Sequence, residues 1–230
     1  MAIVLETSGF NTNALTSSVT NNFNLPSGLS NALLLVVVQL NNNNFETVSS
    51  LTWNGTGLTF WQTDQTKDDA RIEIWYLKDP ESGTHDLVTT YNTSIAEESI
   101  VGYLVLSGVE QAGTPLSGWV IDAAQSGDTT PSVTVTCNVD DLIVASMLGE
   151  NVGSLTTPGD MTEIWNTSVA GQTYGACAYK FADATSEVIN YTMGGSDHRI
   201  LAGFAVAPAS APTELNIFVH DCGDVGEKIG

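Results

Sequence analysis

Short runs of β-branched and aromatic residues, divided at close intervals by turn residues, constrain the fold of this chain more than any other feature. The dividing segments include NLPSGLSN, NGTG, DPESGTH, EQAGTP, SGDTTP and MGGSD, all rich in Gly, Asn, Asp, Ser or Pro. Strands joined by turns have this punctuation, and almost nothing shows the longer period of a helix. We therefore predict an all-β chain folded as a two-sheet antiparallel sandwich.

Several runs alternate in polarity, as strands with one covered face do. In ARIEIWYL one predicted face carries Ala70, Ile72, Ile74 and Tyr76, and the other carries Arg71, Glu73, Trp75 and Leu77. In SVTVTC, residues 132–137, the valines and the cysteine alternate with hydroxyl side chains, which we expect to face outward.

Two runs are apolar on both faces. They are ALLLVVVQL, residues 32–40, and IVGYLVLSGV, residues 100–109. Strands of this kind lie mid-sheet and are covered on each side. We therefore expect a further layer, loop or partner over the outer face of each.

The domain organisation is predicted to be one sandwich over residues 1–208, followed by a strand or tail over residues 209–230. The segment APASAP, residues 207–212, reads as a short linker. Apolar side chains in the tail are expected at an interface with a neighbouring subunit; these are Leu215, Ile217, Phe218 and Val219. A heptad or solenoid repeat is absent from the sequence.

The charge excludes two kinds of partner. The 230 residues hold 6 Lys and Arg against 26 Asp and Glu, a formal net charge of −20. Such a field repels nucleic acid and anionic membrane surfaces. The apolar runs are also much shorter than the roughly 20 residues of a membrane-spanning helix. The start, MAIVLETSGF, lacks the basic and long apolar regions of a secretory signal, so we expect folding in the cytoplasm.

The cysteines indicate neither disulfides nor a metal site. Cys137, Cys177 and Cys222 are odd in number and widely spaced. We expect the first two to be buried small apolar residues and the third to be an exposed thiol in the tail.

The order of several motifs resembles a known module. The motifs run LPSG, NALLLVVV, VSSLTWNGTGLT, RIEIWYLKDPESGTHDL, VGYLVLSGVEQAGTP, DLIVAS, GACAYKFA and AGFAVAP. Over about residues 1–208 they resemble a β-sandwich module of phage structural proteins and bacterial surface proteins. The resemblance implies a jelly-roll-like or concanavalin-like sandwich used for display, adhesion or decoration, with no reaction attached.

Catalytic and metal sites have little support in the sequence. A glycosidase needs two carboxylates facing one bond, but Trp75 and Leu77 occupy the positions where a second acid would accompany Glu73. We interpret Glu73 with Arg71 as a solvated strand pair. The acids of residues 64–69 and 138–141 suit calcium or are simply solvated loop acids. We predict no enzyme, no metal and no cofactor.

A glycan site is an open alternative for the aromatic residues of the first part of the chain. Trp53 and Trp61 flank the NGTG turn and are expected close together across it, and Trp75 is expected to be partly exposed beside Arg71 and Glu73. Large aromatic residues in a sandwich are otherwise core or interface residues.

Together these features predict a structural protein at the surface of a bacteriophage virion, a capsid decoration or cement protein. It would form a homo-oligomer and dock on the major capsid protein. The alternatives are a carbohydrate-binding adhesin or fibre module and, third, a glycosidase on a sandwich fold.

Overall fold

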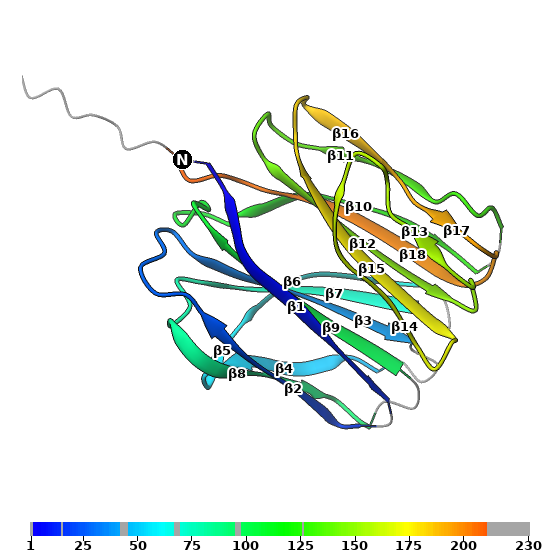
Figure 1. The fold of residues 1–230 in the computed structure, drawn as a ribbon, viewed down its shortest axis with the longest axis horizontal. Helices are drawn as coiled ribbons and strands as arrows, with labels where there is room; N and C mark the ends of the chain where they lie inside the picture. The colour runs from blue at the N-terminus through cyan, green and yellow to red at the C-terminus, as the bar shows by residue number, and fades with distance from the viewer. Residues whose placement is uncertain are drawn as a thin grey trace, which may run out of the picture.

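The computed structural model describes residues 2–14, 16–41, 46–66, 70–94, 98–125 and 127–210, and it consists of antiparallel strands (Figure 1). The first nine strands form the N-terminal half: β1 (Val4–Ala14), β2 (Ser18–Leu25), β3 (Leu33–Asn41), β4 (Val48–Trp53), β5 (Thr56–Gly57), β6 (Thr59–Gln65), β7 (Ala70–Lys78), β8 (Gly83–Tyr91) and β9 (Glu98–Ser107). The other nine form the C-terminal half: β10 (Leu116–Ala124), β11 (Ser132–Thr136), β12 (Leu142–Glu150), β13 (Leu155–Thr156), β14 (Thr162–Val169), β15 (Thr173–Phe181), β16 (Ser186–Asn190), β17 (Thr192–Met193) and β18 (Arg199–Val206). The all-β prediction is confirmed. The described residues contain no helix, and hence none that is long and apolar enough to cross a membrane.

Each half forms a five-stranded inner sheet and a smaller outer layer. The N-terminal inner sheet has the order β1-β9-β3-β7-β6, and its outer sheet has the order β2-β8-β4-β5. The C-terminal inner sheet has the order β10-β18-β12-β15-β14, and its outer layer consists of the ladders β11-β16 and β13-β17. The strand pairings are antiparallel, as predicted. The predicted number of two sheets was wrong, because two sheets make only one half of the described chain.

The two halves repeat one strand plan. Exchanging β1, β9, β3, β7 and β6 for β10, β18, β12, β15 and β14 converts one inner sheet into the other. Irregularities repeat too, since a register shift interrupts the early part of both β1 and β10, and another interrupts the early part of both β6 and β14. Bulges are specific local features, so their recurrence supports the equivalence of the halves.

Single residues also occupy equivalent places in the two halves. Asn31 (φ 53°) and Asp140 (φ 71°) both take left-handed conformations shortly before β3 and β12, which short polar side chains tolerate. The buried Tyr91 and Tyr191 lie at the ends of β8 and β16, and each donates its backbone N–H to the residue just before the paired strand, at 3.0 and 3.2 Å. The repeat therefore extends to turn chemistry and backbone bonding.

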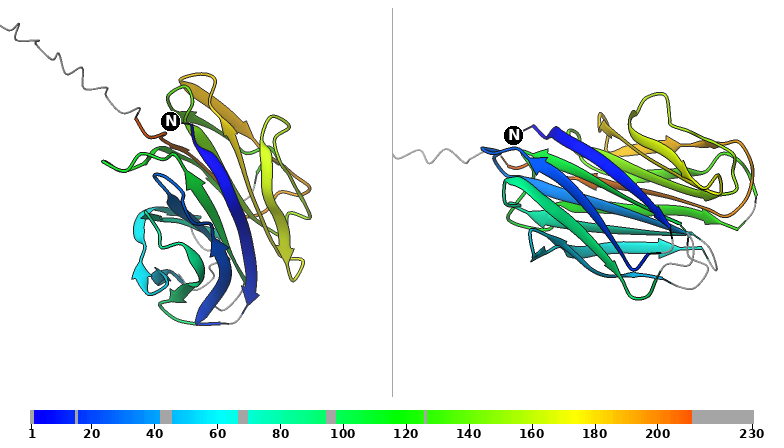
Figure 2. Two further views of the ribbon diagram at one scale, coloured as in Figure 1. Left: turned by 60° about the vertical axis from the view of Figure 1, so that its left-hand side comes forward. Right: turned by 60° about the horizontal axis from the view of Figure 1, so that its bottom comes forward.

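The halves stack as four layers with three apolar cores between them (Figure 2). The inner sheets pack face to face across a central core. Each outer layer covers the other face of its inner sheet across a separate N-terminal or C-terminal core. Sheets can stack in this way because successive side chains of a strand point to opposite faces.

The two apolar runs form central strands, as predicted. All nine residues of β3 are buried. Leu33, Leu35 and Val37 face the central core, whereas Leu34, Val36 and Val38 face the N-terminal core. The expected cover over β3 and β9 consists of the chain's own outer sheet on one side and its C-terminal half on the other.

The contact between the halves has approximate two-fold character. The edge strand β1 lies beside β14, and the equivalent edge strand β10 lies beside β6. In the same way β7 contacts β18, and β9 contacts β15. Each pair is the counterpart of the other after the halves are exchanged, as in the interface of a symmetric dimer.

One buried amide links the halves. The Nε2 atom of Gln39 on β3 lies 2.9 Å from the Ser146 Oγ atom, 2.9 Å from the Met147 carbonyl oxygen and 3.1 Å from the Ala176 carbonyl oxygen, all in the C-terminal half. Hydrogen bonds have directions that apolar packing lacks. This amide therefore helps to set the register of one inner sheet against the other.

Candidate functional site

The predicted group of Trp75, Arg71 and Glu73 is brought together, but not as a solvated pair. Glu73 is only 1% exposed, because the N-terminal outer sheet covers its face of β7. Its Oε1 atom lies 2.7 Å from Arg71 Nε and 3.2 Å from the Val48 backbone N–H nitrogen, and its Oε2 atom accepts a bond from Trp75 Nε1 at 3.0 Å. The prediction of a solvated pair was wrong. The alternation of β7 was read correctly, but the layer above it could not be seen from the strand's own sequence.

Trp53 and Trp61 lie in different layers. Trp53 is fully buried in the N-terminal core and donates its Nε1 hydrogen to the Glu81 carbonyl oxygen at 2.8 Å. Trp61 packs against the central core, where its ring lies 5.8 Å from that of Trp119 and 5.4 Å from that of Phe204. The prediction that they lie close across the NGTG turn was wrong, because the chain crosses from the outer to the inner sheet between β5 and β6.

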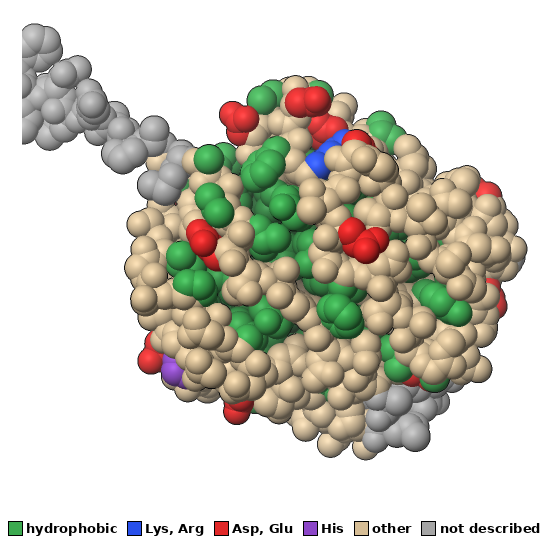
Figure 3. Space-filling model, viewed as in Figure 1, with side chains coloured by type: hydrophobic (Ala, Val, Ile, Leu, Met, Phe, Trp, Pro, Cys, Tyr) green, Lys and Arg blue, Asp and Glu red, His purple; other side chains and the backbone are tan. Residues whose placement is uncertain are grey.

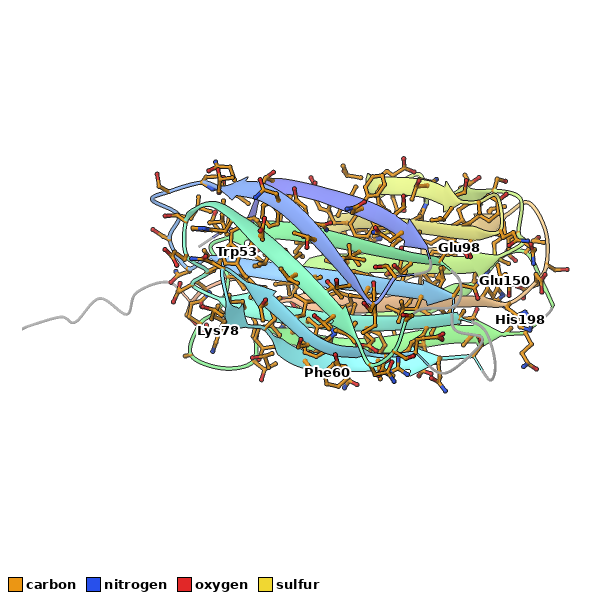
Figure 4. All side chains as sticks on the ribbon, turned by 90° about the horizontal axis from the view of Figure 1, so that it is seen from below. Trp53, Phe60, Lys78, Glu98, Glu150 and His198 are labelled. Carbon is orange, nitrogen blue, oxygen red and sulfur yellow. The ribbon has the colours of Figure 1, made fainter. Side chains whose placement is uncertain are left out.

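An aromatic shelf remains at the far edge of the N-terminal inner sheet. Phe60 on β6 is 45% exposed, and its ring meets the ring of the half-buried Trp75 edge-on, with centroids 5.1 Å apart. Figure 4 shows Phe60 on the outside of the molecule, at the lower rim of the ribbon. Of the predicted glycan-binding tryptophans, Trp75 is thus the one beside an exposed aromatic ring.

The predicted interface residues Leu215, Ile217, Phe218 and Val219 lie outside the described residues. The described chain ends at Ser210, beyond an isolated bridge that pairs Pro208 with Val109. The Ala209 backbone N–H donates to the Gly108 carbonyl oxygen at 2.7 Å. The start of the C-terminal segment is therefore held against the connection between the halves.

A polar hollow surrounds the end of β15, and the sequence analysis did not predict it. It has a volume of about 370 Å³ and is lined by Asp160, Thr162, Tyr179, Lys180, Phe181, Asp183 and Glu187. The Lys180 ammonium lies 2.7 Å from Asp160 Oδ2 and 2.8 Å from Glu187 Oε2. The bond from Lys180 lowers the pKa of the Glu187 carboxyl below its usual value. Partial burial alone would lower the pKa of the Lys180 ammonium, but its bonds to Asp160 and Glu187 outweigh burial and raise that pKa above its usual value.

The two carboxylates of this hollow lie close together but lack the chemistry of a glycosidase. Both carboxylates bond one nitrogen, at 2.7 and 2.8 Å, so these oxygens lie within about 5.5 Å of each other, near the separation of retaining enzymes. Such enzymes need one carboxyl that stays protonated near neutral pH, which requires a raised pKa. The pKa of Glu187 is lowered instead, and Lys180 occupies the space between the two groups. The arrangement suits an ion-pair cluster better than an acid–nucleophile pair.

An apolar hollow adjoins the polar one, and the two share Phe181. It has a volume of about 630 Å³ and is lined by Ala2, Ile3, Asp140, Phe181 and Pro208. Phe181 is 50% exposed. Figure 3 shows hydrophobic side chains gathered on this side of the molecule, between the upper part of β1 and the C-terminal half. The hollow is the open rim of the central core, since Ile3 belongs to that core.

Strand lengths explain why this rim is open. β14 begins at Thr162, which pairs with Tyr179, so the last two residues of β15 extend beyond it. Among the described strands none pairs with Lys180 and Phe181 on that side. The sequence contained a signal for these hollows. In AYKF, Lys180, one of only 6 cations in the chain, stands between the aromatic residues Tyr179 and Phe181.

The remaining ionic groups give weaker support for a functional site. Near one end of the molecule, His198 Nδ1 lies 3.4 Å from Glu150 Oε2 and 3.2 Å from Asp197 Oδ1, and Figure 4 shows Glu98 toward the same end. Asp141, in one of the calcium candidates, is buried and accepts a bond from the Asn138 backbone N–H at 2.7 Å, as a turn residue does. Within the described ranges, no three or more His, Cys, Asp or Glu side chains are grouped as metal ligands.

Comparisons with known proteins identify no relative. No protein-family model, no curated protein and no solved structure matches the chain.

Proposed function

We propose that the chain is a non-enzymatic structural protein of a virus particle, a capsid decoration or cement protein at the surface of a bacteriophage virion. The observation that carries the proposal is the strand plan. With β6 left out, the strands of the N-terminal half lie in the order 1-8-3-6 in one sheet and 2-7-4-5 in the other. This order supports a jelly roll for the N-terminal half as part of the proposal, and jelly rolls are common in viral capsids and lectins.

Two further features support a particle-bound role. The net charge of −20 disfavours nucleic acid and anionic membranes as partners, so the surface suits contacts with other proteins. The apolar rim beside Phe181 is an exposed surface of the kind that marks an interaction site. In this proposal the chain forms a homo-oligomer and docks on the major capsid protein.

Particle binding tests the proposal. Purified capsids that lack the protein are incubated with the full chain, and occupancy is measured by sedimentation and gel densitometry. We expect saturable binding by the full chain and loss of binding after deletion of residues 214–230, with the folded strand signal in circular dichroism unchanged. A matched control deletes only residues 223–230 and keeps the apolar residues 214–222. Full occupancy by the chain lacking 214–230, or no binding by the full chain, contradicts the proposal.

A carbohydrate-binding adhesin is the second candidate, favoured by the shelf of Phe60 and Trp75. Exposed aromatic rings stack on sugars, and the ring of Phe60 is 45% exposed. The candidate predicts glycan affinity that falls more than tenfold in Phe60→Ala and Trp75→Ala. Phe10→Ala, which removes a ring with 43% exposure on β1, is the matched control. A broad glycan array without any binding removes this candidate.

A further inference from the structure

The end of β15 has an edge of two residues that is unpaired in the described part of the chain. Antiparallel strands need an unpaired edge to extend a sheet, and Lys180 and Phe181 lie beyond the start of β14. Beside this edge the apolar hollow provides a volume of about 630 Å³, which is large enough for aliphatic or aromatic side chains. Edge and hollow together resemble a site for an extended peptide with alternating apolar residues.

The chain itself carries such a peptide. Residues 214–219 read ELNIFV, so in a strand Leu215, Ile217 and Val219 would share one face and Phe218 would take the other. This segment begins four residues after the last described residue, Ser210, and Pro208 already lines the apolar hollow. The described chain therefore ends at the rim of the molecule where the hollow lies.

The sequence of the connection favours a neighbouring copy over the same copy. A segment returning to its own hollow must reverse direction within the few residues after Pro208. Pro212 fixes its own φ and keeps the residue before it extended, and no glycine occurs between Gly203 and Gly223. We therefore expect an extended connection, which would direct residues 214–219 toward a neighbouring copy.

We propose that residues 214–219 of one copy add a strand to the open end of β15 in a second copy, with apolar side chains in the hollow beside Phe181. This contact rests on the proposed function, because it supplies the homo-oligomer that docks on the particle. Since a tail from one copy enters a hollow on another, the contact is heterologous and can continue into rings or chains. Screening of the −20 charge on each copy makes the contact stronger in salt.

Complementation between two full-length variants tests the proposal. Ile217→Asp combined with Phe218→Asp removes the apolar tail but leaves the hollow. Phe181→Asp alters the hollow but leaves the tail, and its half-exposed position on the surface favours folding. Phe60→Asp, at 45% exposure on the opposite edge of its sheet from β1, is the matched control. Mass is measured over a range of concentrations by sedimentation velocity and light scattering.

We expect the wild type and Phe60→Asp to associate equally, and each docking variant to associate at least about 30-fold more weakly. An equimolar mixture of the two docking variants should form one-to-one pairs, because each supplies what the other lacks. Raising NaCl from 0.05 to about 0.5 M should tighten wild-type association. A monomeric wild type, docking variants that associate normally, a mixture that stays monomeric, or association that weakens in salt would each overturn the proposal.

Particle occupancy, measured separately, keeps the two proposals apart. A wild type that is monomeric yet occupies capsids refutes the tail contact and the homo-oligomer, and leaves the particle-bound role standing. A wild type that associates through its tail but does not bind capsids refutes the proposed function and leaves the tail contact standing.

Discussion

At the scale of single residues, the amide of Gln39 is one of the polar groups that join the halves, beside the bond from Asn41 Nδ2 to Thr173 Oγ1. Gln39→Met keeps the volume but leaves the carbonyls of Met147 and Ala176 without this donor in a buried site. Leaving buried acceptors unsatisfied costs about 1–3 kcal/mol, so we expect that loss in the free energy of unfolding, measured by urea denaturation. Gln62→Met, on the partly exposed β6, is the control and should change stability by less than about 0.5 kcal/mol. Equal effects of the two substitutions would contradict this role for Gln39.

Buried tyrosines make the protein sensitive to alkali. Burial raises the pKa of Tyr91 to about 12, and burial also raises the pKa values of Tyr103 and Tyr191. Above pH 10 the unfolded chain releases these protons first. It then binds fewer protons than the folded chain, and stability falls as pH rises.

For Tyr91 alone, the expected loss between pH 8 and pH 11 is about 1.4 kcal/mol. Tyr91→Phe should remove that part of the loss, as measured by urea denaturation at both pH values. The control is Tyr174→Phe, whose exposed hydroxyl bonds the Gly171 carbonyl oxygen. An identical pH dependence of wild type and Tyr91→Phe would show that Tyr91 does not contribute.

At the scale of strands, close packing of β9 on β14 depends on a missing side chain. A Cβ atom at Gly102 would clash with the ring of Trp165, which is buried in the central core. Gly102→Ala should therefore destabilise the protein by about 1–3 kcal/mol through overpacking. In Trp165→Phe the smaller ring leaves room, so the same Gly102→Ala change should cost less there. A double-mutant cycle measures this difference, and additive effects would contradict the contact.

The strands were the part of the fold that their own sequence could predict. Side chains alternate along a strand, so the two faces of residues 70–77 and the two covered faces of β3 followed from polarity alone. The environment of Glu73 and Trp61 did not follow, because it depends on which sheet covers each face. That depends on pairings between residues far apart in the chain, such as β3 with β9 and β12 with β18.

At the scale of the whole molecule, the repeat of the fold could not be recognised in the sequence, because equivalent positions of the two halves share residue patterns more often than identical residues. LTWNGTGLT and LTTPGDMT correspond, and SVT recurs at 18–20 and 132–134. Yet the register shift in β6 falls at Trp61, whereas the one in β14 falls at Ile164. Trp61 and Trp165, which follow the two corresponding segments in the sequence, therefore occupy positions in their sheets that differ by one residue. The open rim at Phe181 was hidden for a related reason, since it exists only because β14 starts late.

The shared central core predicts that the two halves unfold together. Residues of both inner sheets make one continuous apolar cluster, and opening either half exposes the other half's share of it to water. Cooperativity across that core should give one calorimetric transition with equal calorimetric and van't Hoff enthalpies.

Gly203→Ala tests this prediction with a methyl group that points into the C-terminal core, on the face of β18 turned away from the N-terminal half. Its Cβ atom would lie 2.7 Å from Val135 Cγ2, in the C-terminal core. Overpacking there should cost about 1–3 kcal/mol, which lowers the melting temperature by about 2–4 °C per kcal/mol in a chain of this size. If the halves are coupled, the whole transition moves down and stays single. If the core between the inner sheets does not couple them, the C-terminal half melts first and a second transition remains at the wild-type temperature.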